Sequence, residues 1–196
     1  MRRSPISINY AEAPVVMCED EEQVDKALEI TEQCPCVKHI IYHDPRGMRK
    51  YDDPRLISQE RLFELADELD RERPELYREL VAATNGDDVA MLITTSGTTS
   101  KPKLSMMQAG PFLDHCMAYL RADPKYPDDN YVSVLPLPWI MEQVYAVAES
   151  LLSRITVNFV EATETMMSDL REIGPNFVLL APRVCGRPLP PTSRRG

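Results

Sequence analysis

Apolar positions along the chain alternate between two spacings. Continuous apolar runs predict strands at 14–18, 37–42, 89–93, 131–135, 155–160 and 177–180. Between these runs, apolar residues recur three or four positions apart, which predicts helices at about 21–31, 58–84, 111–121, 139–153 and 163–173. Strands that alternate with helices favour an α/β fold with a mainly parallel sheet and flanking helices.

Several short signals sharpen the expected ends of these elements. Asp20 stands three residues before Gln23, which resembles a capping box and predicts the start of a helix. Asn85-Gly86 and Gly174-Pro175 predict helix ends. The run Val89 to Ile93 is so densely apolar that we expect a buried strand there.

Composition and charge then limit the kinds of partner. The 196 residues include 43% hydrophobic side chains, enough for the core of one domain. The formal net charge is -9 and the sequence pI is about 4.9, so the chain repels nucleic acid and anionic surfaces. We therefore expect no nucleic-acid partner, and any phosphate site must be a local arrangement.

Cysteine usage and the N-terminal segment indicate a protein of the reducing cytoplasm. The five cysteines are odd in number and follow no regular spacing, so we expect neither a disulfide framework nor a metal site. The arginines near the N-terminus are followed by polar residues rather than by a long apolar stretch, so we expect no signal peptide and no transmembrane segment. Peripheral association with a membrane stays open.

The segment 94–103 is the main candidate for chemistry. Small hydroxyl and glycine residues occupy every position from Thr95 to Thr99, directly after an apolar run. Hydroxyl and backbone N–H groups can donate to phosphate oxygens, Gly97 allows close approach of the backbone, and Lys103 adds a positive charge. Walker A does not fit, because Pro102 stands five residues after Gly97. The alternative is an ordinary polar surface loop.

The same segment resembles the phosphate-binding motif of the adenylate-forming superfamily, Thr-Ser-Gly-Thr-Thr-Gly-x-Pro-Lys. Ser100 replaces the second glycine of that motif. In that family the loop joins two strands and holds the β- and γ-phosphates of ATP, so the resemblance implies a second strand at 103–107. The residues that it assigns to the ATP phosphates are Thr95, Ser96, Gly97, Thr98, Thr99 and Lys103. The usual histidine after the second strand is absent.

A second segment narrows the resemblance. Residues 131–143, which include Leu-Pro-Leu-Pro-Trp-Ile-Met-Glu-Gln, are similar to the next segment of long-chain fatty acyl-CoA ligases. The likeness covers about residues 4–184, and it implies that Trp139 borders the acyl site. The alternatives are that Trp139 anchors the core and that Glu142 lies on a solvated helix face.

The resemblance implies a two-step reaction with ATP, Mg²⁺ and coenzyme A, in which a fatty acid becomes an acyl-adenylate and then an acyl-CoA. The adenine-binding Tyr-Gly-x-Thr-Glu segment and the small C-terminal domain of the family are not found in the sequence. We therefore expect 1–184 to be part of an AMP-binding N-terminal domain, inactive alone, and 185–196 to be a disordered non-family tail. Other hypotheses are a non-catalytic remnant or part of an aryl- or amino-acid-activating relative.

Overall fold

The computed structural model describes residues 5–95 and 103–180. They form two compact units, and β4 and β5 contribute residues to both. Unit 1 holds the described residues 5–88, 94–95 and 103–106, and unit 2 holds 89–93 and 107–180. The predicted tail at 185–196 lies outside the described residues.

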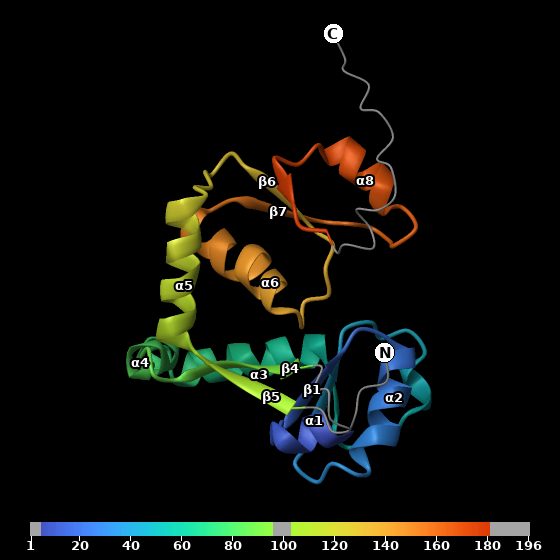
Figure 1. Cartoon of the computed structure of the whole chain (residues 1–196). Coiled ribbons are helices and arrows are strands. Elements are labelled where there is room, and N and C mark those ends of the chain that lie inside the picture. Colours follow the sequence, from blue (N-terminus) through green and yellow to red (C-terminus); the bar gives the residue numbers. More distant parts are fainter. Residues whose placement is uncertain (1–4, 96–102, 181–196) are drawn as a thin grey trace. The chain divides into compact units, whose positions relative to one another are not determined.

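Unit 1 is built on a three-stranded parallel sheet in the order β1-β2-β3. Its strands and helices are α1 (Pro5–Tyr10), β1 (Val15–Cys18), α2 (Glu21–Thr31), β2 (His39–Tyr42), η1 (Met48–Lys50), β3 (Leu56–Ser58), α3 (Gln59–Glu72) and α4 (Leu76–Ala83). Val16, Ile40 and Leu56 stand in register across the three strands. Figure 1 shows α2 beside this sheet, in blue.

The core of unit 1 lies between this sheet and α2. Val16 and Cys18 point inward from alternate positions of β1, as the period of a strand requires. They meet Val24 and Ala27 from the buried face of α2. The helix starts as predicted, because the carboxylate of Asp20 accepts a hydrogen bond of 2.9 Å from the backbone N–H of Gln23.

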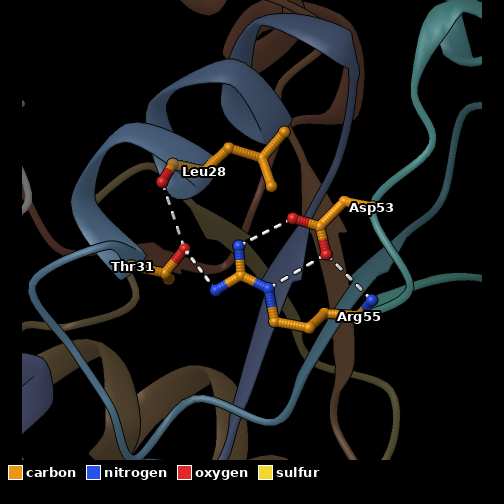
Figure 2. A network of polar contacts seen from close by, with 4 residues as sticks. All are labelled: Leu28, Thr31, Asp53 and Arg55. Atoms are coloured by element: carbon orange, nitrogen blue, oxygen red, sulfur yellow. Dashed lines mark hydrogen bonds and ion pairs between the residues drawn. The ribbon is translucent and has the colours of Figure 1, made fainter.

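A polar network closes the other end of α2 (Figure 2). Arg55 donates to both carboxylate oxygens of Asp53, at 3.0 and 2.7 Å, and to the hydroxyl of Thr31 at 3.2 Å. The Thr31 hydroxyl in turn donates to the carbonyl of Leu28 at 3.2 Å. The network thus joins the last turn of α2 to the residue that precedes β3.

Strands β4 (Val89–Thr95) and β5 (Lys103–Gln108) form a two-stranded sheet of their own. Their seven-residue connection is too short for a parallel crossover, so they run antiparallel. The strand expected at 103–107, directly after the Ser/Thr loop, is confirmed as β5. The prediction of a buried strand at Val89 to Ile93 is wrong: Val89 is 50% exposed and Leu92 40%. Within the described residues β4 pairs with β5 alone, and a two-stranded sheet offers few neighbours to cover the apolar side chains on its faces.

Unit 2 contains a second three-stranded parallel sheet, in the order β7-β6-β8. Its further elements are α5 (Ala109–Ala122), β6 (Asn130–Ser133), α6 (Ile140–Glu142), η2 (Gln143–Glu149), α7 (Ser150–Ser153), β7 (Thr156–Phe159), α8 (Met166–Ile173) and β8 (Phe177–Val178). Phe112 and Cys116 of α5 pack against Val144 and Ala148 of η2 in its core. The predicted helix at 139–153 is present, but η2 has π-helical hydrogen bonding.

The α/β fold with parallel sheets and flanking helices is confirmed in both units. In the ranges 5–95 and 103–180, none of the helices combines the length and apolar character that a membrane span requires. The four cysteines within these ranges, Cys18, Cys34, Cys36 and Cys116, form no disulfide bond with one another.

Candidate functional site

The ends of the Ser/Thr loop are held together by β4 and β5. Thr95 is the last residue of β4 and Lys103 the first of β5. The hydroxyl of Thr95 donates to the backbone carbonyl of Lys103 at 3.4 Å, and both residues are exposed. The other four proposed phosphate ligands, Ser96, Gly97, Thr98 and Thr99, lie outside the described residues. The structure therefore brings the two ends of the loop side by side at one end of a hairpin.

Trp139 lies in unit 2, at the start of the helix that follows β6. It is the N-cap of α6, with extended backbone angles, and 47% of its surface is exposed. Its N–H donates to the Pro136 carbonyl at 2.9 Å. Its carbonyl accepts from the N–H groups of Glu142 and Gln143, at 3.0 and 3.2 Å. The exposure does not support a core anchor, which was one of the two interpretations of Trp139.

Glu142 is fully buried, which excludes the alternative that it lies on a solvated helix face. Its Oε2 accepts a hydrogen bond of 2.9 Å from the hydroxyl of Tyr131, and its Oε1 accepts one from the hydroxyl of Ser133. Tyr131 and Ser133 lie two residues apart on β6 and so face the same side of the sheet. The two hydroxyls replace water around a carboxylate that would otherwise be costly to bury.

Aromatic rings surround the buried end of this cluster. Tyr131 stacks on Phe177 with ring centroids 5.1 Å apart, and Tyr145 lies 5.9 Å from Tyr131. The Nζ of Lys125 lies 4.5 Å from the centre of the Phe177 ring, in cation–π geometry. Burial, followed by the hydrogen bond to Glu142, raises the pKa of the Tyr131 hydroxyl, so this group stays protonated and remains a donor.

A second buried carboxylate lies further along the same helix. Glu149 is 1% exposed, and its Oε2 has no hydrogen-bond partner within the described residues. Burial raises the pKa of Glu149; Lys125 lowers it in part, and Asp123 raises it. Glu149 in turn helps to raise the pKa of the Tyr145 hydroxyl and of the Cys116 thiol, for both of which burial is the larger cause.

The described part of the chain offers no cluster of three or more His, Cys, Asp or Glu side chains able to hold a metal ion. At the described ends of the loop, the Thr95 hydroxyl and the Lys103 ammonium are exposed. Both groups are donors that suit phosphate oxygens.

A protein-family model described as AMP-binding enzyme matches residues 6–192, nearly the whole chain. The chain belongs to the AMP-binding enzyme family. The resemblance to adenylate-forming enzymes that the loop indicated is therefore confirmed.

Curated relatives of this AMP-binding chain are long-chain-fatty-acid–CoA ligases. Ligase 1 of Cavia porcellus is 25% identical over 191 residues, covering 92% of this chain and 26% of the relative. The heimdall ligase of Drosophila melanogaster is 27% identical over 179 residues, covering 88% of this chain and 26% of the relative. The chain thus spans about a quarter of the length of these relatives.

Solved structures of this family share the fold. An anthranilate CoA ligase, AuaEII, in complex with anthranoyl-AMP superposes with a TM-score of 0.63 at 12% identity, covering 90% of this chain and 33% of that one. A luciferase-like enzyme from the mealworm Zophobas morio gives a TM-score of 0.60 at 15% identity, with coverages of 92% and 40%. These likenesses confirm the α/β fold.

Sequence reasoning missed the buried polar cluster around Glu142 and Glu149. One signal was available: Glu142 and Glu149 are seven residues apart, two helical turns, on a helix whose Val144 and Ala148 are also buried. Two carboxylates on or beside an apolar face indicate buried acids with dedicated partners. Without the fold, however, the partners on β6 could not be named.

Proposed function

We propose that this chain is the phosphate-loop part of an ATP-dependent long-chain fatty acid–CoA ligase, and that it is inactive alone. The observation that carries the proposal is the hairpin that sets exposed Thr95 beside exposed Lys103 at the two ends of the loop. The long-chain fatty acid ligases among its relatives support the substrate class. A cytoplasmic location and the lack of a nucleic-acid partner belong to the same proposal and fit the acidic composition.

In the proposed first step a fatty acid carboxylate oxygen attacks the α-phosphorus of ATP. The bond between that phosphorus and the bridging oxygen breaks, and pyrophosphate leaves. Lys103 would hold the β- and γ-phosphates by charge, together with the hydroxyls of Thr95, Ser96, Thr98 and Thr99 and the backbone of Gly97. Mg²⁺, when bound to ATP, neutralises phosphate charge that these donors leave uncovered.

In the proposed second step the coenzyme A thiol loses its proton and attacks the acyl carbon, and AMP leaves. Trp139 would border the acyl chain, since a half-exposed indole offers an apolar surface that a hydrocarbon can cover. The rest of the catalytic machinery would come from sequence beyond the matched quarter of the relatives. For that reason we assign phosphate and acyl contacts to this chain and no catalytic residue.

The experiment is equilibrium dialysis of the full chain against ATP with Mg²⁺, with Lys103→Ala beside Lys38→Ala. Lys38 is an exposed lysine of unit 1 at a distance in sequence from the loop and serves as the matched control. We expect weak binding that Lys103→Ala removes and Lys38→Ala keeps. Binding that ignores the loss of Lys103, or equal losses in both variants, contradicts the assignment of the loop.

A second measurement tests the acyl class. Trp139 is the single tryptophan of the chain, so its fluorescence reports directly on the proposed acyl site. Oleate should change this fluorescence, and benzoate at the same concentration should not. A response to benzoate alone would favour an aryl-acid-activating relative instead.

A further inference from the structure

Trp139 has little packing of its own to fix its position. Trp139 is 47% exposed, and it lies in a turn between β6 and α6 rather than inside a helix or strand. A side chain in such a place takes its position from the backbone that carries it. The groups that hold the backbone of the turn formed by residues 136–139 therefore also fix the position of the indole.

Two residues of the following helix hold this turn, both through backbone N–H groups and one also through its side chain. The backbone carbonyl of Trp139 accepts from the N–H groups of Glu142 and Gln143, at 3.0 and 3.2 Å. The side chain of Gln143 reaches back, and its Nε2 donates to the carbonyl of Leu137 at 2.6 Å. Gln143 thus contacts the turn at two carbonyl groups, those of Leu137 and Trp139.

Glu142 fastens the same helix start to the sheet. Its carboxylate is fully buried and accepts from Tyr131 and Ser133, both on β6. A carboxylate with both oxygens engaged from one strand fixes the first turn of the helix in position and in rotation. Tyr131 is itself held by the stack on Phe177 of β8, so the anchor is part of the sheet core.

We infer that Glu142 and Gln143 are positioning residues that set the place of the Trp139 indole at the acyl site. The Glu142 carboxylate fixes the start of the helix to β6 through two hydrogen bonds, and the Gln143 side chain fixes the turn to the helix through one. This inference rests on the proposed function for the role of Trp139, but the rigidity of the turn is measurable without it. Neither residue touches the acyl chain in this scheme.

The test uses the fluorescence anisotropy of Trp139 and its quenching by acrylamide in the full chain. The variants are Glu142→Gln, Glu142→Ala and Gln143→Ala, and the control is Glu172→Gln, an exposed glutamate of α8. We expect lower anisotropy and stronger quenching in the order Glu142→Ala, then Glu142→Gln, because glutamine keeps one acceptor. Gln143→Ala should loosen the indole while leaving the melting temperature close to that of the control.

A second reading is the affinity for oleate, which should weaken about tenfold in Glu142→Ala and Gln143→Ala. Unchanged anisotropy and quenching in a folded Gln143→Ala would overturn the inference, and so would a fall in the control as large as in the variants. If Glu142→Ala does not fold, Tyr131→Phe with Ser133→Ala removes the same two hydrogen bonds and keeps the carboxylate and the aromatic stack. If oleate does not change the wild-type fluorescence but the variants still show the expected order of anisotropy, the assignment of Trp139 to the acyl site is wrong. The positioning of Trp139 by Glu142 and Gln143 is then still supported.

Discussion

Arg55 donates from Nη1 to the hydroxyl of Thr31 at 3.2 Å, which ties the residue before β3 to the last turn of α2. Its other donors hold Asp53, two residues earlier in an Asp-Pro-Arg sequence. The chain contains a second Asp-Pro-Arg at Asp44 and Arg46, in which the backbone N–H and the Nε of Arg46 likewise donate to the Asp44 carboxylate. The two copies differ in their surroundings, because the Arg46 side chain is 89% exposed and the Arg55 side chain 29%.

This difference predicts unequal effects of the same substitution. Arg55→Lys removes the paired contact with Asp53 and the link to Thr31, and should lower the free energy of unfolding by about 1 kcal/mol. Arg46→Lys should leave it unchanged within error, because solvent competes for exposed ion pairs. Urea denaturation followed by circular dichroism measures both. Equal losses in the two variants would show that the link to Thr31 contributes nothing.

The buried carboxylate of Glu149 predicts how stability changes with pH. Its pKa is raised above the ordinary value of 4.5, so the folded state binds a proton that the unfolded state has already lost. Stability should therefore fall as the pH rises from that ordinary value through the raised one. Lys125, Asp123, Cys116 and Tyr145 are the charged or titratable groups that interact with it.

Glu149→Gln should flatten this pH dependence and raise the stability at neutral pH by about 1 kcal/mol, because an amide is less costly to bury than a carboxylate. Denaturation followed by Trp139 fluorescence reports on unit 2, where both residues lie. Glu172→Gln, on the exposed face of α8, should keep the wild-type pH dependence. A variant at Glu149 with the same slope as wild type would rule out this carboxylate as the source.

Gly174 ends α8 in the left-handed region, with φ 58° and ψ 57°. Space is available for a side chain there, since no atom of the described residues comes within 4 Å of the position of a Cβ. Gly174→Ala should therefore cost only the backbone strain, about 1 kcal/mol. Gly174→Asn should cost less, since asparagine tolerates this conformation better. Thermal unfolding of the two variants would compare them, and a loss in Gly174→Asn as large as in Gly174→Ala would contradict strain as the cause.

The isolated chain should release no detectable pyrophosphate from ATP and Mg²⁺ in the presence of oleate. Loss of a single preorganised donor can lower a rate by about 10²–10³, and the proposal places several groups that act together outside the matched quarter of the relatives. Lys103→Ala is measured in parallel. Turnover that depends on Lys103 would contradict the inactivity and support the loop, whereas turnover independent of Lys103 would count against both.

Much of the fold follows from the sequence because local signals agree with it. Asp20 and Gly174 mark helix ends by their own chemistry, and the apolar spacing predicts most of the strands and helices that the structure contains. Strand β3 was not predicted, because three residues, Leu56–Ser58, are too few to show a period. Helix α1, at Pro5–Tyr10, was not predicted either, and its six residues make fewer than two turns.

Burial was harder to predict than secondary structure. Val89 to Ile93 has the composition of a core strand, yet exposure depends on how many strands flank it, which composition does not record. For Glu142 the sequence left a solvated helix face open as an alternative, because a charged residue is buried only where tertiary contacts satisfy it, and its partners on β6 lie 9 and 11 residues away. Of the loop residues, only Thr95 and Lys103 fall within the described ranges, and their role stays a prediction.

The π-helical stretch at Gln143–Glu149 also affects how this protein should be compared with others. Hydrogen bonds from each residue to the fifth along accommodate one residue more than an α-helix over the same span. A relative with an uninterrupted α-helix here would need one residue fewer to connect the same two strands. A correct sequence alignment with such a relative would then place a single-residue gap inside a helix, where gaps are normally disfavoured. An alignment without the gap would shift every position after Glu149 by one residue.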